Sequence, residues 1–198
     1  MARRHLFAAA LLIATLAACD SGGGDSRPTT TTPATASFPT DGMRRPVIPN
    51  PLDATAFLKK PCTSLTPDQH EKFKLDGGKV GESAEGSPKC VYSHAGDGVV
   101  WEIVYGTGQG GRLHAPAEVR LQPGVRWVTE ILDNYPAIAE YYVDDSVSAE
   151  NPPRCVYMVG LNDEVAFGVV VRSAEGGQEC TVGRQIATDV LSNIKKRQ

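Results

Sequence analysis

The 198-residue chain lacks the patterns that usually reveal an active site or a membrane-spanning helix. It contains no Gly-x-Ser-x-Gly elbow, no His-Glu-x-x-His pair and no Cys-x-x-Cys motif, so no familiar hydrolase or zinc site is indicated. The apolar stretch over residues 6–18 has 13 residues, fewer than the roughly 20 that a spanning helix needs. A catalytic triad assembled from distant residues stays open, but no local motif predicts one, and we predict no enzyme and no cofactor.

The chain also lacks a stripe of basic residues. Removing residues 1–18, which include Arg3 and Arg4, leaves 18 basic and 23 acidic residues and a net charge of about −5. An acidic surface of this kind does not favour a nucleic-acid partner.

The first 19 residues have the layout of an exported lipoprotein precursor. Arg3 and Arg4 precede a short apolar segment, and Leu16-Ala17-Ala18 leads directly to Cys19. A positive segment followed by apolar and then small residues is typical of a secretory signal peptide. Its end resembles a bacterial lipobox, in which the cysteine is acylated and becomes the mature N-terminus. We therefore predict a signal peptide over residues 1–18 and lipidation, palmitate included, at Cys19; ordinary cleavage beside an incidental Cys19 is the alternative.

The residues after Cys19 are rich in Gly, Ser, Thr and Pro up to residue 51. Such a segment buries too little apolar surface to offset the entropy of ordering it, so we predict a disordered linker over residues 19–51 and a single domain over 52–198. Thr and Pro together also suit an O-glycosylated stalk, with an unmodified spacer as the alternative. The predicted localisation is the outer face of the cell membrane, and the membrane is a predicted partner through the lipid anchor.

Four cysteines remain once Cys19 is lipidated: Cys62, Cys90, Cys155 and Cys180. Export would place them where disulfides persist, and four cysteines allow three pairings. We favour the local pairing, Cys62 with Cys90 and Cys155 with Cys180, because each bond closes a loop of fewer than thirty residues. Each would stabilise the fold by about 3–4 kcal/mol in the chain-entropy model.

Helix signals lie at both ends of the predicted domain. Asp53 is placed to cap a short helical turn, and Thr66, followed by Pro and by Gln at the reciprocal capping position, begins a second helix. That helix is expected to end near Leu75, and the polar residues 79–88 are expected to form a loop. The last helix should begin near Thr181, where apolar residues recur at helical spacing: Val182, Ile186, Ala187, Val190, Leu191 and Ile194.

The sequence between these helices predicts strands. Residues 125–132 also fit a helical stripe, but their Trp, Val, Thr and Ile residues favour a strand, with residues 133–136 as a turn. The remaining predicted strands are 90–92, 99–105, 137–143, 155–161 and 165–171. Strands bracketed by helices predict an α+β fold, with an antiparallel sheet packed against N- and C-terminal helices.

The order of these features resembles a known family. The residues that carry the resemblance are Pro61-Cys62, Cys90-Val91-Tyr92, Cys155-Val156-Tyr157 and Cys180, with the helix that ends at Ile194. Together with the lipobox and the linker, they resemble a family of small actinobacterial lipoproteins whose four-cysteine domain has no assigned function. The resemblance covers about residues 52–196; it implies an α+β fold and membrane anchoring, and it implies no activity.

Two sets of residues deserve mention as candidate sites. The glycine-rich residues 106–111 follow a strand, but a phosphate-binding loop must open a helix, so a mobile loop is the expectation. His70 is expected on an exposed helix face, and His94 and His114 in loops. Each histidine is isolated in sequence from other ligands, so we expect surface roles and no metal site.

Acidic and aromatic residues near position 140 form the last candidate. Glu140 with Asp144 and Asp145 could bind a cation, although a solvated acidic edge is the default expectation. Tyr141 and Tyr142 must point to opposite faces of a strand, so one of them is expected to line an exposed groove.

The leading functional hypothesis is therefore a non-enzymatic binding or scaffolding module of the cell envelope, with an unknown envelope protein as partner. A carrier or sensor that holds an apolar ligand between sheet and helix is the second hypothesis. A hydrolase with dispersed catalytic residues is the third.

Overall fold

The computed structural model describes residues 46–95, 99–108, 113, 125–142, 154–172 and 177–198. The helical elements are α1 (Thr55–Lys59), the 3₁₀ helix η1 (Pro61–Thr63), α2 (Pro67–Lys72) and α3 (Glu179–Lys195). The strands are β1 (Lys79–Glu82), β2 (Pro88–Ser93), β3 (Val100–Thr107), β4 (Val125–Leu132), β5 (Tyr135–Tyr142), β6 (Arg154–Gly160) and β7 (Val165–Arg172).

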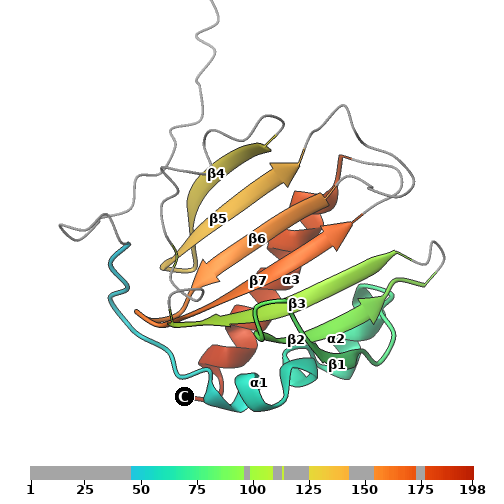
Figure 1. Cartoon of the computed structure of the whole chain (residues 1–198), viewed down its shortest axis with the longest axis horizontal. Helices are drawn as coiled ribbons and strands as arrows, with labels where there is room; N and C mark the ends of the chain where they lie inside the picture. Colours follow the sequence, from blue (N-terminus) through green and yellow to red (C-terminus); the bar gives the residue numbers. More distant parts are fainter. Residues whose placement is uncertain (1–45, 96–98, 109–112, 114–124, 143–153, 173–176) are drawn as a thin grey trace, which may run out of the picture. The chain divides into compact units, whose positions relative to one another are not determined.

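The seven strands form one antiparallel sheet in the order β1-β2-β3-β7-β6-β5-β4. Figure 1 shows α3 behind the sheet, with α1 and α2 near its lower edge. The predicted α+β class is confirmed, and each predicted strand is present, including the one over residues 125–132. The tight turn between β6 and β7 is held by Asn162, whose side-chain oxygen accepts hydrogen bonds from the N–H groups of Glu164 and Val165.

Helix α3 packs on β6 and β7, and η1 packs on β2 and β3. The apolar stripe that the sequence predicts for α3 is its buried face: Ile186, Leu191 and Ile194 are at most 1% exposed. Burial of each such side chain stabilises the fold by about 1.5–3 kcal/mol. At the other end of the sheet, Phe57 of α1 stacks on Tyr105 of β3 with ring centroids 6.4 Å apart.

Two disulfides join helical elements to the face of the sheet that packs against α3, which we call the covered face. Cys62 of η1 bonds to Cys90 of β2, and Cys155 of β6 bonds to Cys180 of α3, with Cα separations of 4.9 and 5.1 Å. Both bonds match the predicted pairing. Each disulfide links a helical element to a strand. Both therefore hold the helical layer against the sheet, in addition to closing a loop.

Helix α2 begins as predicted but ends earlier. The Thr66 hydroxyl accepts a hydrogen bond from the Gln69 N–H at 3.3 Å, and the Gln69 side chain accepts one from the Thr66 N–H at 2.8 Å. The predicted end near Leu75 is wrong, because α2 ends at Lys72. Lys74 has a left-handed φ of 53°, and Leu75 then pairs with His94 in an isolated bridge.

Two predicted loops are shorter than expected. Residues 79–88 contain β1, which pairs with β2 at the edge of the sheet. The residues of β1 are mostly exposed, and the sequence shows no apolar alternation there. The turn after β4 takes only two residues, because Asp133 and Asn134 both adopt positive φ (48° and 71°), as a tight hairpin turn requires. Tyr135 and Pro136 therefore belong to β5.

The segment before Leu52 already contacts the domain. Ile48 packs against the core, and the Tyr135 hydroxyl donates a hydrogen bond of 2.7 Å to the Asn50 carbonyl. Residues 46–51, predicted as linker, thus include contacts with the sheet. The predicted signal peptide, Cys19 and linker residues up to 45, together with His114, Asp144, Asp145 and residues 109–111, lie outside the described residues.

Candidate functional site

The face of the sheet opposite α3 carries the main candidate site. Alternate residues of each strand point to this face, which we call the open face. The pair Tyr141–Tyr142 follows this alternation as predicted: Tyr141 pairs with Cys155 on the covered face, and Tyr142 pairs with Arg154 on the open face. The open face carries its own small apolar cluster, in which Leu113, Ile138 and Ala166 are buried.

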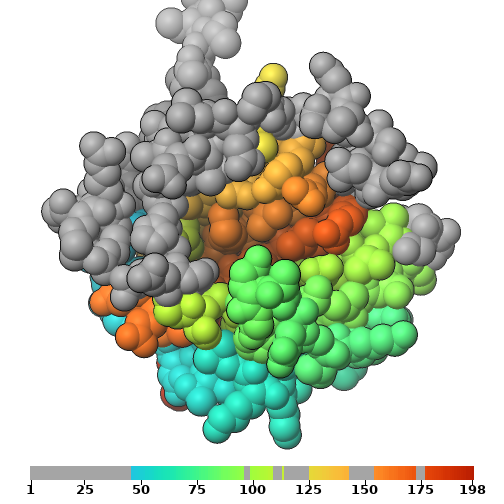
Figure 2. All heavy atoms as spheres, viewed as in Figure 1, coloured from blue at the N-terminus to red at the C-terminus, as the bar shows by residue number. Residues whose placement is uncertain are grey.

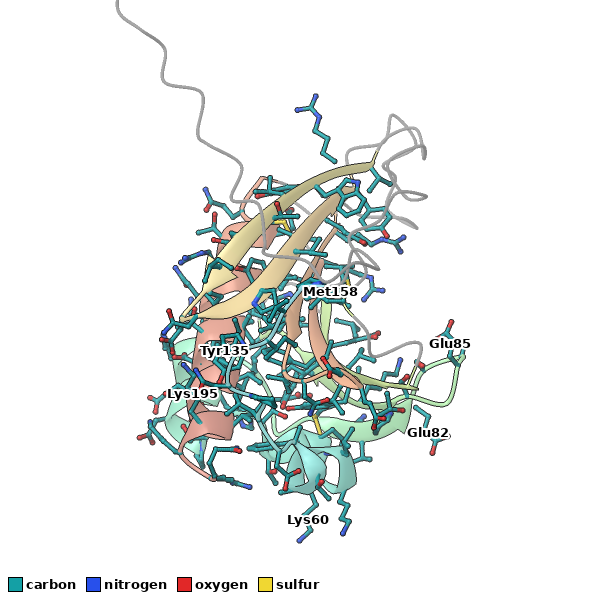
Figure 3. The ribbon with its side chains drawn as sticks, turned by 90° about the vertical axis from the view of Figure 1, so that its left-hand side faces the viewer. Lys60, Glu82, Glu85, Tyr135, Met158 and Lys195 are labelled. Atoms are coloured by element: carbon teal, nitrogen blue, oxygen red, sulfur yellow. A yellow bond between two sulfur atoms is a disulfide. The ribbon has the colours of Figure 1, made fainter. Side chains whose placement is uncertain are left out.

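A groove of about 380 Å³ lies on the open face. Its floor is formed by apolar residues of β3, β6 and β7, among them Val104, Val156, Met158 and Val170. Its wall is the turn between β1 and β2, which contributes Ser83, Glu85 and Ser87. In Figure 2 the green atoms of this hairpin stand beside the orange floor, and in Figure 3 Glu82 and Glu85 project from the sheet on the side away from Lys195 of α3.

The groove exists because three floor positions carry almost no side chain. Gly106, Ala166 and Gly168 lie on neighbouring strands, where Gly168 pairs with Val104 on one side and with Met158 on the other. A Cβ at Gly168 would lie 3.7 Å from Cγ of Met158 and 3.9 Å from Cγ1 of Val156, which is ordinary contact. Larger side chains would therefore fill the groove without forcing the strands apart.

Charged residues mark one end of the groove. Arg172 of β7 lies 3.6 Å from Glu102 of β3, which also pairs with Lys89 of β2 at 3.3 Å. The guanidinium of Arg154 lies over the Tyr142 ring, 3.9 Å from its centroid. Polar groups at this end can orient a ligand whose apolar part lies on the floor.

Glu140 sits close to this end but is not part of a solvated acidic edge. It is 9% exposed, and burial raises the pKa of its carboxyl group, against smaller lowering effects of the Tyr142 hydroxyl and of Arg154. The Tyr142 hydroxyl donates a hydrogen bond of 3.1 Å to Oε2 of Glu140. The expectation that Glu140 belongs to a solvated acidic edge is therefore wrong, because its side chain is buried.

The predicted histidines are packed against aromatic rings. His70 contacts the edge of Tyr92 with ring centroids 5.3 Å apart, and burial lowers its pKa; its expected exposed position is wrong. His94 stacks on Trp101 at 4.8 Å. Neither histidine lies among the residues of the groove. In the described ranges no group of three or more His, Cys, Asp or Glu residues is placed to hold a metal ion.

The glycine-rich segment does not open a helix. Gly106 and Thr107 belong to β3, and Gly108 follows with a φ of 59°. Gly106 contributes instead to the groove floor. A glycine inside a strand pattern often marks a place where another group approaches the backbone, and this signal at Gly106 and Gly168 would have located the groove from the sequence.

A second hollow of about 570 Å³ lies where β3 and β7 meet the start of α1. It is lined by Asp53, Asp163 and Glu164 among other residues. Asp53 is engaged in structure, because its Oδ1 accepts a hydrogen bond of 2.8 Å from the Thr55 N–H. The predicted cap at Asp53 is wrong, because Ala54 is the N-cap residue of α1 and no side chain caps this helix. The hollow offers no comparable apolar floor.

None of the helices in the described part of the chain has the length and apolar content to cross a membrane. Among the described residues the fold is α+β, with helices packed on one face of the sheet and the groove on the other. The chain belongs to the DUF3558 family, described as proteins of unknown function, whose family model matches residues 14–193. Searches of curated proteins and of solved structures found no match.

Proposed function

We propose that this protein is an exported, lipid-anchored binding module that holds an apolar ligand in the groove of its open face. The observation that carries the proposal is the groove itself, about 380 Å³ in volume with an apolar floor on three strands. This volume lies in the range of small-molecule sites, which are mostly apolar with a few polar groups. The proposed ligand site lies on the open face, whereas the hypothesis drawn from the sequence placed an apolar ligand between sheet and helix.

A non-enzymatic role fits the chemistry of the described residues. His70 and His94 contact aromatic rings, and the four cysteines Cys62, Cys90, Cys155 and Cys180 are consumed in disulfides. The groove combines apolar side chains with two serines and one glutamate. No histidine or free thiol among these lining residues is available to activate a nucleophile.

The groove is tested by filling it. The full-length chain carrying Cys19→Ala is titrated with the uncharged fluorescent probe N-phenyl-1-naphthylamine. Gly168→Leu should weaken probe binding at least about tenfold, which corresponds to about 1.4 kcal/mol. Gly81→Leu is the matched control: Gly81 is also a strand glycine, a Cβ there meets Lys89 at 3.6 Å, and it lies outside the groove lining.

Circular dichroism and thermal unfolding verify that both variants fold, and Gly168→Ala replaces Gly168→Leu if the latter does not. Absence of probe binding to the unsubstituted groove, or equal binding by the Gly168 and Gly81 variants, would overturn the ligand site.

The lipid anchor is tested separately. Cys19→Ala should move the protein from the membrane fraction to the medium, or leave an unprocessed precursor, because the acylated thiol is lost. Two or more acyl chains hold a protein stably on a membrane, so the unsubstituted chain should stay there. Ser21→Ala serves as control. An unchanged membrane fraction for Cys19→Ala contradicts the anchor and leaves the groove proposal untouched.

A further inference from the structure

Two arginines face each other at one end of the groove. Arg154 of β6 is the direct cross-strand partner of Arg172 of β7. Along the same strands and on the same face, the next residues toward the groove are Val156 and Val170, which line its floor. Successive residues on one face of a strand are about 7 Å apart, so the arginine pair lies directly beyond the apolar floor.

This placement is unfavourable for the protein alone. Like charges directly opposite each other on a sheet destabilise it, and the two guanidinium groups lean toward different neighbours. Arg154 lies over the Tyr142 ring, whereas Arg172 approaches Glu102 and donates a long hydrogen bond of 3.5 Å to the Val100 carbonyl. Glu102 is shared with Lys89, so one carboxylate serves two cations.

The arginines also keep unused hydrogen-bonding capacity. Nε of Arg154 is buried and has no hydrogen-bond partner in the described part of the chain. A buried donor without an acceptor costs free energy, and a guanidinium offers five N–H donors in a planar fork that matches a carboxylate or phosphate. Glu102 neutralises Arg172 in part and Glu140 lies near Arg154, and an anion between the two strands would supply the acceptor that Nε of Arg154 lacks.

The opposite end of the groove has the opposite character. Its wall carries Glu85, on the hairpin turn that also contributes Ser83 and Ser87. Figure 3 shows Glu85 at the far rim of the molecule, away from the sheet. A negatively charged group would be repelled by Glu85 and attracted to Arg154 and Arg172. An anionic ligand would therefore bind in the groove in one orientation.

We infer that the groove binds a single-chain amphiphile with an anionic head, of the fatty-acid type, whose head lies between Arg154 and Arg172 and whose chain lies on the apolar floor. This inference rests on the proposed ligand site and adds the chemical class of the ligand and its orientation. Charge-assisted, two-pronged contacts to guanidinium groups fix the head, and the apolar floor of β3, β6 and β7 accepts the chain.

The test compares two probes with the same chain length, one with an anionic head group and one with an uncharged head group. Dodecanoate and dodecan-1-ol, both below their aggregation limits, displace N-phenyl-1-naphthylamine from the full-length chain carrying Cys19→Ala. Dodecanoate should bind at least about tenfold more tightly than dodecan-1-ol, a difference of about 1.4 kcal/mol. The double variant Arg154→Gln/Arg172→Gln should abolish this preference by weakening dodecanoate binding.

Lys72→Gln is the matched control, because Lys72 lies on α2 and pairs with Asp189 of α3, away from the groove. If the double glutamine variant does not fold, each single substitution should lower the preference in part.

If the unsubstituted chain binds both probes equally, the inference that the ligand has an anionic head is wrong, whereas the proposed ligand site stands. A preference that survives the arginine substitutions would overturn the assignment to Arg154 and Arg172. Binding to phosphatidylglycerol vesicles without binding of either probe would overturn both this inference and the ligand site, in favour of a membrane surface.

Discussion

The covered and open faces of the sheet are built from the same strands but from different kinds of side chain. The covered face presents large residues that are almost fully buried, such as Tyr92, Tyr105 and Tyr157, each at most 1% exposed. The open face combines apolar residues such as Met158 with a glycine, Gly168, and with the charged residues Arg154 and Arg172. The covered face therefore supplies most of the stability, because apolar burial dominates the free energy of folding.

Each face has buried polar atoms with a hydrogen-bond partner and buried polar atoms without one. On the covered face the Tyr105 hydroxyl pairs with the Ser64 hydroxyl at 2.7 Å, and the Tyr157 hydroxyl donates to Glu130, which also pairs with Arg184 of α3 at 3.1 Å. Nε1 of Trp127 and Nε of Arg154 on the open face, and the Tyr92 hydroxyl on the covered face, are buried without a hydrogen-bond partner among the described residues. A buried polar group without a partner costs free energy on either face.

The largest expected difference concerns truncation of apolar side chains on the two faces. Leu191→Ala, on α3 against the covered face, should lower the free energy of unfolding by about 2–5 kcal/mol, because it leaves a cavity in the core. Met158→Ala, on the groove floor, should lower it by about 1 kcal/mol or less, because that side chain is only half-buried. Urea unfolding measures both values. Equal losses would show that the open face is part of the core.

A smaller difference is expected between two glycines. At Gly78, which has a φ of 70°, a Cβ would lie 2.5 Å from Sγ of Cys90 and 2.7 Å from Cε1 of Tyr92. Gly78→Ala should therefore lower the free energy of unfolding by about 2–3 kcal/mol, from backbone strain and overpacking. Gly81→Ala, on β1 with only ordinary contacts, should change it by less than about 0.5 kcal/mol. A loss of unfolding free energy as small as that of Gly81→Ala would mean that the disulfide and Tyr92 can move away from the added Cβ of Gly78→Ala.

The smallest expected effect is a pH dependence that originates on the open face. Burial raises the pKa of Glu140 in the folded chain above its value in the unfolded chain. Between the two pKa values the folded state keeps a proton that the unfolded state has lost, so stability falls as the pH rises. The fall should begin at about pH 4, near the ordinary pKa of Glu, and end above the folded pKa.

Glu140→Gln should reduce this fall, because the amide does not titrate. Chemical unfolding of both proteins across about pH 4–8, the range in which a Glu with a raised pKa titrates, measures the difference between the two profiles. Parallel profiles would show that Glu140 is solvated enough to titrate normally.

Local signals determined much of the fold. The capping box at Thr66, the alternation in residues 99–105 and the apolar stripe of α3 each depend on residues that are close in sequence, and each matches the structure. The spacing of Cys62, Cys90, Cys155 and Cys180 likewise indicated the two disulfides, because short loops close at low entropic cost. Predictions of this kind need no knowledge of which strands become neighbours.

Elements whose stability comes from distant partners were missed. Strand β1 lacks an apolar pattern and exists because its backbone pairs with β2 at the sheet edge. Helix α2 ends early because Leu75 pairs with His94, nineteen positions away. Long-range backbone pairing overrides weak local propensity in both cases.

The sequence by itself determined which residues are small, charged or apolar, and it determined the periodicity of the strands and of α3. Only the tertiary structure decided that Gly106, Ala166 and Gly168 lie side by side as a groove floor, and that Arg154 faces Arg172 at its end. The physical reason is register: the pairing of β3, β7 and β6 sets which side chains share a face, and a shift by one residue would move every one of them to the other side.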